Sequence, residues 1–527
     1  MQALGIDRDR VLQQIEIFRR SNFSARLKKP CTLGDGVRKV EETGAQKYLD
    51  LHEKAARAGR FMKFVPASGA ATRMFQSLLQ IYYLPQYLDS DELYRRVGQG
   101  VAIACDFARF LEHLHQFPFT EDLAEIMAQD GLDMEEVILQ GEFRMLLDYL
   151  LTKRGLNYGC LPKALLKFHT YRDETRTAFE EHLAESIAYT EANSGKCKLH
   201  FTIPPQHAEF CNSHMEDACR RFRDRSGISF DIGFSFQKTS TNTIAVDTKG
   251  YPFRNRFGRL HFRPAGHGAL LENLNELQAD LVYIKNIDNI VPDRLRDRVC
   301  FWKKVLGGYL VGLQERIHDF VRVLKNPAGS GDERVVETIR QARLFANEEE
   351  LPLAFPADFD AWPAEKKRSF LLDRLDRPIR VCGVVPNAGE PGGAPFWVED
   401  ANGVLSVQIV EKAQVNFGSE EQQQIWNSST HFNPVDIVCC TKDCDAKPYD
   451  LRKFVDPDAV IITKKFKDGE EIRALELPGL WNGSMAHWTT VFVEVPPYTF
   501  NPVKSVYDLL RPEHQPEGSP DTLSGIE

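Results

Sequence analysis

Short apolar runs alternate with longer amphipathic segments along most of this chain, and this alternation constrains the fold more than any other feature. Apolar residues at helical spacing mark several of the intervening segments, the longest over residues 302–324. Strands that alternate with helices predict an α/β fold with a mostly parallel central sheet. The runs typical of buried strands cover residues 199–203, 228–236, 243–246, 281–284, 379–385, 396–398, 405–410, 435–439 and 459–463.

The length of the chain indicates more than one folding unit. A chain of 527 residues exceeds the size at which one hydrophobic core usually suffices, so about two or three domains are expected. Residues 1–60 are predicted to be mainly helical, because apolar residues recur there at helical spacing. We predict an α/β domain over residues 61–458, with a helical insertion over about 74–155. Residues 459–527 are expected to form a small β-rich C-terminal domain and a polar tail.

Charge and cysteine content limit the possible partners. The net charge is −9 without a long basic run, which argues against a nucleic-acid coat and an anionic membrane surface as partners. No stretch approaches the ~20 apolar residues of a membrane span, and the first twenty residues do not resemble a signal peptide. The 11 cysteines lack zinc-site spacing, so reduced thiols are expected. These features predict a cytoplasmic protein of unspecified oligomeric state.

Residues 61–75, FMKFVPASGAATRMF, hold a candidate phosphate-binding loop. An apolar run meets a loop of very small residues, and Thr72 and Arg73 then open a helix-like segment. Small residues such as Ser68 and Gly69 let backbone N–H groups approach a ligand, and a helix N-terminus favours an anion. Arg73 adds a planar cation suited to phosphate. A tight turn with Arg73 in a structural ion pair explains the same residues, so both interpretations stay open.

Two later segments carry further ligand-binding candidates. In LPKALLKF, Lys163 begins an apolar run, and a lysine beside a phosphate loop would neutralise charge. A plain surface lysine is the alternative. In RPAGHGALL, Gly266 and Gly268 form a tight loop on which a flat nucleobase could lie. His267 between them is a ligand contact or a structurally satisfied histidine.

The segment LVYIKNIDNIVPD places polar residues directly after a strand-like run. Ligand-binding residues gather at the carboxyl ends of parallel strands, where Asp288 and Asn289 are expected. A carboxylate there suits Mg²⁺, which prefers oxygen ligands. An Asx turn that ends the strand is the alternative for Asp288. Weaker candidates are Asn387 and Glu390 for sugar hydroxyls, Glu411 at the end of a strand, and Lys504 before a helix.

The order of these segments resembles the sugar-1-phosphate nucleotidyltransferases, in particular the UDP-sugar pyrophosphorylase branch. Residues 67–73 are similar to the family's Gly-rich loop that ends in Thr-Arg, and residues 162–166 to its Pro-Lys-x-Leu segment. Three later matches are residues 264–270 with a Pro-x-Gly-x-Gly-Gly-Leu loop, 286–289 with an Asp-Asn strand end, and 500–504 with a Phe-x-Pro-x-Lys segment. As a whole, the chain also resembles the domain-of-unknown-function 4301 proteins.

The resemblance implies a Rossmann-like, GT-A-like sheet that binds a nucleoside triphosphate, a sugar 1-phosphate and Mg²⁺. It implies that Arg73 holds the leaving phosphates, Lys163 the α-phosphate, Asp288 the metal and Lys504 the sugar phosphate. The loop residues Ser68, Gly69 and Thr72 would line the phosphates. Gly266 and Gly268 would face the nucleobase, and His267 and Asn289 would be further substrate-binding residues. Asn387, Glu390 and Glu411 would face the sugar. A second metal ligand would come from HFNPVD, where Asp436 is favoured over Asn433.

The chain departs from the family pattern in several places. Ser68 and Ala71 replace family glycines, and Ala269 replaces another. Some 90 positions separate Arg73 from Lys163, which the predicted helical insertion explains. Two other functions therefore stay open: a nucleotide- or sugar-binding regulatory protein without turnover, and an assembly protein that works through its helical insertion.

Overall fold

A large mixed α/β sheet organises the molecule. The computed structural model describes residues 4–20, 24–69, 71–328, 332–347, 351–389, 392–400 and 403–517. Within these residues the central sheet has nine strands, and all neighbours pair in parallel except around β15, which is antiparallel to both β11 and β12. The predicted mostly parallel sheet is therefore confirmed. In spatial order the strands are β2 (Thr32–Leu33), β3 (Gly36–Lys39), β18 (Thr489–Glu494), β12 (Ile379–Pro386), β15 (His431–Cys440), β11 (Leu281–Lys285), β4 (Phe61–Pro66), β7 (Lys196–Thr202) and β8 (Ser229–Ser235).

Both faces of the central sheet are covered, which is why its inner strands read as continuous apolar runs. On one face, Tyr283, Val381 and Val438 belong to a core with α2 (Gln46–Arg57) and α12 (Asp293–Lys325). Helix α9 (Ala178–Thr190) packs against β4 and β7, and α10 (Ala208–Ser226) against β8. On the opposite face, Val282 and Ile437 pack with α11 (Leu271–Leu277) and residues 451–488.

Three smaller sheets flank the central one. Strands β1 (Arg26–Pro30), β13 (Ala394–Glu399) and β14 (Leu405–Val410) form the first. The second has the order β10 (Phe262–Arg263), β9 (Thr243–Asp247), β17 (Glu470–Glu476) and β16 (Ile461–Lys467). Strands β5 (Lys167–Thr170) and β6 (Thr175–Thr177) pair as the third. Every run predicted as a strand overlaps one of these strands or those of the central sheet.

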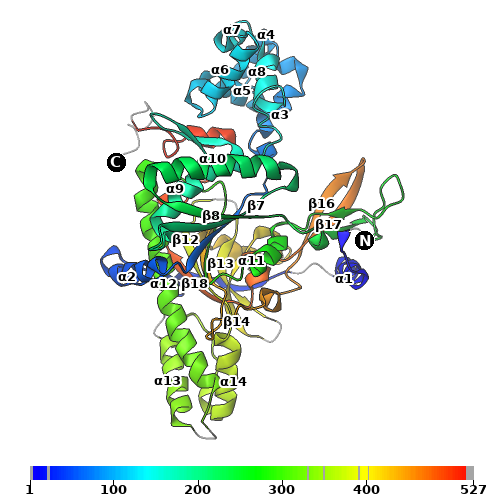
Figure 1. Ribbon diagram of the computed structural model, residues 1–527. Helices are drawn as coiled ribbons and strands as arrows, with labels where there is room; N and C mark the ends of the chain where they lie inside the picture. Colours follow the sequence, from blue (N-terminus) through cyan, green and yellow to red (C-terminus); the bar gives the residue numbers. More distant parts are fainter. Residues whose placement is uncertain are drawn as a thin grey trace.

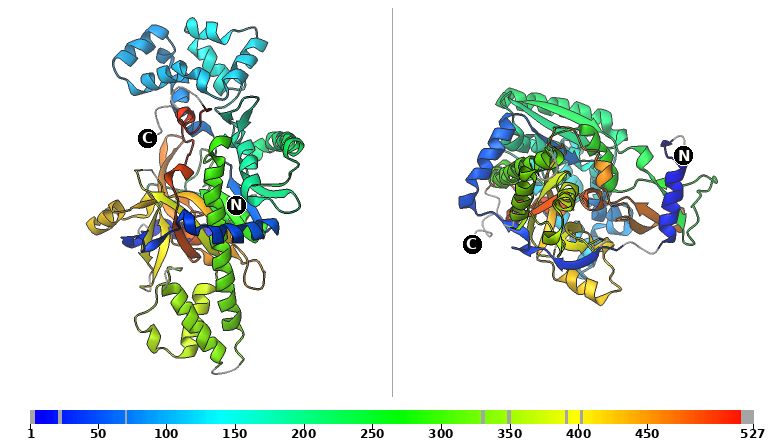
Figure 2. Two further views of the ribbon diagram at one scale, coloured as in Figure 1. Left: turned by 90° about the vertical axis from the view of Figure 1, so that its left-hand side faces the viewer. Right: turned by 90° about the horizontal axis from the view of Figure 1, so that it is seen from below.

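Two helical bodies project from opposite ends of the molecule (Figures 1 and 2). One is the predicted insertion, whose core contains Phe107, Phe119 and Leu146. The other joins the far half of α12 to α13 (Glu333–Asn347) and α14 (Ala364–Leu375). The insertion comprises α3 (Gln76–Tyr82), α4 (Ser90–Gly98), α5 (Ala102–Glu112), α6 (Thr120–Gln129), α7 (Met134–Leu139) and α8 (Phe143–Leu151).

The mainly helical prediction for residues 1–60 was wrong for their middle part. Helix α1 (Arg8–Arg19) and α2 are present, but β1, β2 and β3 lie between them. Val37 of β3 is fully buried opposite Phe492 of β18, and β1 pairs with β13. Pairing with strands from distant sequence determines these short strands, whereas local periodicity reports only on neighbouring residues.

The prediction of a small C-terminal domain was also wrong for residues 461–494. Strand β17 pairs with β9, and β18 lies inside the central sheet between β3 and β12. The run TTVFVE of β18 reads like any buried strand, and its sequence carries no signal of the sheet that it joins. Helix α15 (Glu420–Asn427) packs against β1 of the first small sheet. None of the helices in the described part of the chain has the length and apolar composition of a membrane span.

Candidate active site at the carboxyl edge of the sheet

The parallel strands of the central sheet end along one common edge. Strands β4 and β11 pair directly in parallel, and β12 has the same direction because both β11 and β12 are antiparallel to β15. Ser68 and Gly69 follow β4, residues 286–289 follow β11, and Asn387 follows β12. The carboxyl edge of such a sheet is where ligands usually bind. Several sequence candidates therefore share one edge.

A lysine–aspartate–lysine cluster of Lys163, Asp288 and Lys504 lies at this edge. The Nζ atom of Lys163 is 2.9 Å from Asp288 Oδ2 and donates to the Val503 carbonyl at 2.7 Å. The Nζ atom of Lys504 is 3.0 Å from each Asp288 carboxylate oxygen. Asp288 and Lys163 are buried, whereas the Lys504 side chain is 59% exposed. Two cations thus share one carboxylate, which leaves the cluster with a net positive charge.

The cluster keeps Asp288 ionised. Burial alone would raise the pKa of Asp288, but the charges and hydrogen bonds of Lys163 and Lys504 outweigh burial, so this pKa lies below its ordinary value. Burial lowers the pKa of Lys163, and the Asp288 carboxylate offsets only part of that effect. An incoming anion would compete with Asp288 for both ammonium groups. The arrangement is therefore suited to the exchange of one anion for another.

The small-residue loop is anchored to the segment that carries Lys163. The Lys163 N–H group donates to the Gly69 carbonyl at 3.2 Å, and the Ala71 N–H group donates to the Leu161 carbonyl at 3.1 Å. The side chains of Thr72 and Arg73 are exposed, and Thr72 Oγ1 donates weakly to the Gly159 carbonyl at 3.5 Å. Arg73 has no ion pair with another described residue, so the structural ion pair considered from the sequence is not formed.

A second candidate group surrounds His267. Its ring stacks on Trp481 with centroids 4.1 Å apart, and its Nδ1 accepts from the Leu480 N–H group at 3.0 Å. Since Nδ1 accepts, the neutral ring carries its hydrogen on Nε2, which lies 3.6 Å from Glu411 Oε1. Burial opposes ionisation of Glu411, but His267, together with hydrogen bonds from Asn482 and Trp481, outweighs burial, so the pKa of Glu411 lies below its ordinary value. His267 is thus held by protein groups on its ring face and at Nδ1, with Glu411 close to Nε2.

The two glycines that flank His267 are required by packing. Gly266 has φ +75°, a backbone conformation that favours glycine. A Cβ on Gly268 would lie 2.1 Å from the Pro478 carbonyl oxygen. Residues 476–478 therefore fill the space beside these glycines on the side where a Cβ would project.

Two glycines of the candidate site should respond differently to alanine. Gly69→Ala is expected to leave the free energy of unfolding nearly unchanged, because a Cβ there meets no described atom within 4 Å. Gly268→Ala is expected to cost about 1–3 kcal/mol, because overpacking forces the backbone to shift. Urea denaturation of both variants measures the difference. Equal stabilities would contradict the packing role of Gly268.

Asp436 lies in a buried charged cluster, defined here as Lys63, Glu185, Lys285, Lys303 and Asp436. Asp436 forms an ion pair with Lys303, while Glu185 contacts Lys63 at 2.9 Å and Lys285 at 2.6 Å. None of the five residues is more than 5% exposed. A metal ion at Asp436 would have to displace Lys303 inside the core, so the structure gives Asp436 an ion-pair role in place of the expected metal-ligand role.

The donor set at the edge does not form a metal site by itself. Both oxygens of Asp288 face lysine ammonium groups. In the part of the chain that the structure describes, no three His, Cys, Asp or Glu side chains are grouped to hold a metal. The residues therefore do not fit the expected Mg²⁺ without rearrangement, and no chemical step is derived through it.

Three further sequence candidates occupy different settings. Asn289 Oδ1 accepts from the Asn501 N–H group at 2.9 Å, which ties the end of β11 to the segment that carries Lys504. Asn387 is exposed and accepts from the Gly389 N–H group at 3.0 Å within a turn. Glu390 lies outside the described residues.

Sequence reasoning missed the buried charged cluster and the pair formed by His431 and Glu494, whose Nε2 and Oε2 atoms are 2.9 Å apart. One signal was available: Lys63 interrupts the apolar run FMKFV. A lysine inside a buried strand requires a carboxylate partner. The partner, Glu185, comes from a helix more than a hundred residues later and carries no local signature.

The fold and the cluster define a mixed α/β protein with a positively charged site at the carboxyl edge of its sheet. The model of the domain of unknown function DUF4301 matches residues 1–515, and the chain belongs to this family, which confirms that resemblance. No curated protein matches the chain.

Several solved structures are similar to this chain at low sequence identity. UDP-glucose pyrophosphorylase from Leishmania major, known in open and closed structures, is 11% identical with a TM-score of 0.44, over 97% of this chain and 76% of that chain. The uridine diphosphate N-acetylglucosamine pyrophosphorylase from Trypanosoma brucei in complex with inhibitor is 12% identical with a TM-score of 0.43, over 95% and 74%. A putative UDP-N-acetylglucosamine pyrophosphorylase from Entamoeba histolytica is 10% identical with a TM-score of 0.39, over 88% and 82%.

Proposed function

We propose that this chain is a nucleotidyltransferase of Rossmann-like, GT-A-like fold that joins a nucleoside triphosphate to a sugar 1-phosphate and releases pyrophosphate. The observation that carries the proposal is the lysine–aspartate–lysine cluster beside the small-residue loop. Two ammonium groups within 3.0 Å of one carboxylate provide a surplus positive charge where phosphates would lie. Arg73, at the end of the small-residue loop itself, is exposed and adds a third cation.

The reaction needs charge neutralisation and alignment more than proton transfer. A phosphate oxygen of the sugar 1-phosphate attacks the α-phosphorus, and the bond from that phosphorus to the bridging oxygen of the β-phosphate breaks. The second pKa of a phosphate monoester is about 6, so the nucleophile is ionised at pH 7 and needs no general base. Catalysis then comes from in-line positioning and stabilisation of the charge on the five-coordinate phosphorus.

Each cluster residue has a place in this scheme. Lys163, buried and fixed by the Val503 carbonyl, would contact the α-phosphate. Lys504, largely exposed, would take the phosphate of the second substrate. Asp288 would hold both lysines in place before substrates bind. Arg73 would neutralise the departing pyrophosphate, with Ser68, Gly69 and Thr72 along the phosphates.

The assignments for base and sugar follow the sequence resemblance. Residues 266–268 and Asn289 would lie near the nucleoside, and Asn387, Glu390 and Glu411 near the sugar. We leave Asp436 out because of its pairing with Lys303. Mg²⁺ remains part of the proposal as the counter-ion of the triphosphate.

Pyrophosphate release tests the proposal. The purified protein is incubated with Mg²⁺, each of several nucleoside triphosphates and a panel of sugar 1-phosphates, with a parallel series in EDTA. Turnover is expected with Mg²⁺, and its loss is expected in Asp288→Asn and Arg73→Ala variants that keep their melting temperature. Lys464→Met, which alters a side chain that is 79% exposed, is the control.

The other outcomes identify the alternatives. Triphosphate binding without pyrophosphate would indicate the regulatory protein. No nucleotide binding under any condition would overturn the proposal and favour an assembly protein. If turnover were unchanged in EDTA, Mg²⁺ would no longer be part of the proposed mechanism.

A further inference from the structure

Strand β8 ends the central sheet, so one of its two sides has no neighbouring strand. It pairs in parallel with β7 along its whole length. The bonds at the two ends of this ladder show which residues face β7. The Ser229 N–H group donates to the Gly195 carbonyl at 2.9 Å, and the Ile203 N–H group donates to the Ser235 carbonyl at 2.9 Å. Because the direction of the backbone groups alternates along a strand, the residues of β8 that bond to β7 are Ser229, Asp231, Gly233 and Ser235.

The three residues between them, Phe230, Ile232 and Phe234, direct their backbone N–H and C=O groups away from β7. No residue that the structure describes forms a hydrogen bond with these outward groups. Their side chains pack in the core under α10, yet each is only partly buried. Helix α10 therefore leaves the margin of the sheet open. Strand β8 presents a free row of hydrogen-bonding groups beside a strip of apolar side chains.

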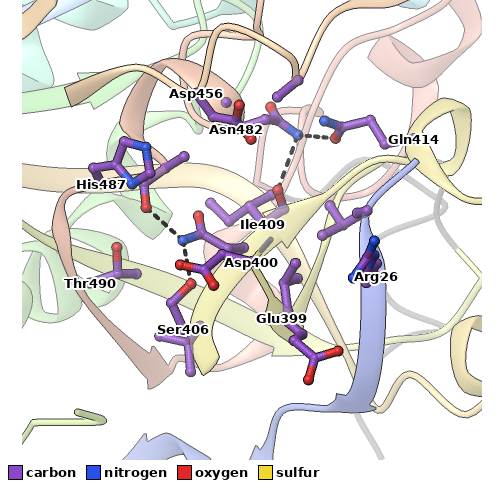
Figure 3. Close-up of a pocket in the computed structure, with 18 of the residues that line it drawn as sticks. Arg26, Glu399, Asp400, Ser406, Ile409, Gln414, Asp456, Asn482, His487 and Thr490 are labelled. Atoms are coloured by element: carbon purple, nitrogen blue, oxygen red, sulfur yellow. Dashed lines mark hydrogen bonds between the residues drawn. The ribbon is translucent and has the colours of Figure 1, made fainter. Parts of the chain in front are cut away.

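Three other edge strands of this protein are protected. On β1, Gln422 Oε1 accepts from the Leu27 N–H group at 2.8 Å, and Gln422 Nε2 donates to the Leu27 carbonyl at 2.9 Å. On β14, Asn482 Nδ2 donates to the Ile409 carbonyl at 3.3 Å (Figure 3). Strand β16 carries three lysines, which disfavour pairing with another chain. Strand β8, in contrast, has seven residues with a single charge, no proline and no bulge, so nothing in it opposes pairing.

The sequence of β8, SFDIGFS, reads almost the same in both directions. An antiparallel pair of two copies about a twofold axis at Ile232 would place Phe230 opposite Phe234 of the partner subunit, an aromatic pair that stabilises a sheet. Asp231 would face Gly233 of the partner subunit, so no like charges would be directly opposed. The residues with outward backbone groups would meet one another, and each such pair exchanges two hydrogen bonds. A twofold interface must be self-complementary, and this strand meets that requirement.

Helix α10, which packs on β8, is self-complementary in charge. The twofold axis at Ile232 would place two copies of α10 antiparallel on the same face of the joined sheet. The acidic part of each helix would then lie on the side of the basic part of the other, which favours a second copy of this chain over an unrelated strand. The acidic part carries Glu209, Glu216 and Asp217, and the last two turns carry Arg220, Arg221, Arg223 and Arg225 beside Asp224.

From the free edge, the near-palindromic strand and the charges of α10, we propose that β8 pairs in antiparallel with β8 of a second copy of this chain. The two central sheets then form one continuous sheet across a twofold axis. This dimer goes beyond the proposed transferase activity and does not depend on it, because the free side of β8 contains none of the residues assigned to the substrates.

Sedimentation equilibrium of the full chain over a range of micromolar concentrations tests the dimer. Ile232→Pro removes an outward N–H group and keeps the bonds to β7, since proline is tolerated on edge strands in that position. Two double variants test the register: Phe230→Lys with Phe234→Lys opposes like charges, whereas Phe230→Glu with Phe234→Lys opposes unlike charges. Phe466→Lys, at a side chain that is 73% exposed on edge strand β16, is the matched control.

Ile232→Cys keeps the test decisive if one of these variants fails to fold. In the proposed pair the two Cα atoms at position 232 lie ~5.5 Å apart, within the ~4.4–6.8 Å range that a disulfide spans. Mild oxidation should therefore link two chains of this variant. Lys464→Cys on β16 and the unaltered chain, which has an exposed Cys160, measure the background. Melting temperatures establish which variants are folded.

The unaltered chain is expected to sediment as a dimer, and Ile232→Pro is expected to weaken the dimer about tenfold or more, because two backbone hydrogen bonds are lost. The variant with two lysines should dissociate at concentrations where the glutamate–lysine variant and Phe466→Lys remain dimeric. The proposal is overturned if the unaltered chain is a monomer at every concentration, if the folded β8 variants dimerise as the unaltered chain does, or if oxidation links Ile232→Cys no faster than Lys464→Cys.

Discussion

Replacing Glu185 by glutamine is expected to lower the free energy of unfolding by about 3–5 kcal/mol, the usual cost of breaking a buried ion pair. Glu185 is the carboxylate shared by Lys63 and Lys285, and all three side chains are buried. The substitution leaves two ammonium groups in the core without their counter-charge. Urea denaturation at pH 7 measures the loss, with Glu216→Gln on the exposed face of α10 as the matched control.

The same residue should make stability depend on pH. Burial opposes ionisation of Glu185, but Lys285 and Lys63 outweigh burial and hold its pKa well below its usual range. A depressed carboxyl pKa contributes stability that is present above the unfolded-state pKa, about 4.5, and is lost as the pH falls toward the folded-state pKa. Stability of the unaltered chain should therefore fall more steeply below pH 4.5 than that of Glu185→Gln. Parallel pH profiles would contradict a charged Glu185.

Replacing either lysine of the active-site cluster by methionine is expected to reduce kcat/KM about 10²–10³-fold if the chain is the proposed transferase, since such groups stabilise charge in the transition state. The two variants should differ in the substrate whose KM is raised. Lys163→Met should raise KM for the triphosphate, because Lys163 lies beside the small-residue loop. Lys504→Met should raise KM for the sugar 1-phosphate. Steady-state kinetics with each substrate varied in turn measures the split.

Lys464→Met is the control for both variants, since its side chain is largely exposed on β16. Identical changes in both KM values for the two cluster variants would argue against separate phosphate contacts. If Lys163→Met lost activity and also had a lower melting temperature, its loss would be ascribed to folding. The activity of Lys504→Met would then decide whether the cluster binds the substrate phosphates.

Local sequence signals predicted much of the fold. The run at residues 281–284 was expected as a strand because it is short, apolar and followed by polar residues, and β11 is buried along its whole length. Periodicity likewise indicated the helical insertion. Strand β3 could not be predicted in this way, because its residues GVRK become a strand through pairing with β18.

The candidate site was likewise predictable from sequence only where the signal is local. Residues directly after strands, such as Asp288, were visible because strand ends are recognisable in sequence. Their association with Lys163 and Lys504 followed only from the family resemblance, since no local pattern relates positions so far apart. The contacts of His267 with Trp481 and of Asp436 with Lys303 depend on tertiary packing, and nothing near them in the sequence indicated either contact.

The position of β18 has a consequence for the order of events during synthesis. This strand connects β3, near the start of the chain, with β12, and the segment that carries Lys504 follows it directly. A ribosome must therefore translate past Glu494 before the sheet can close, and past Lys504 before Asp288 can acquire its second lysine. Contacts between such distant residues form slowly, and the growing chain exposes unpaired strands until they do. Partial chains would thus depend on chaperones and would lack the assembled charge cluster.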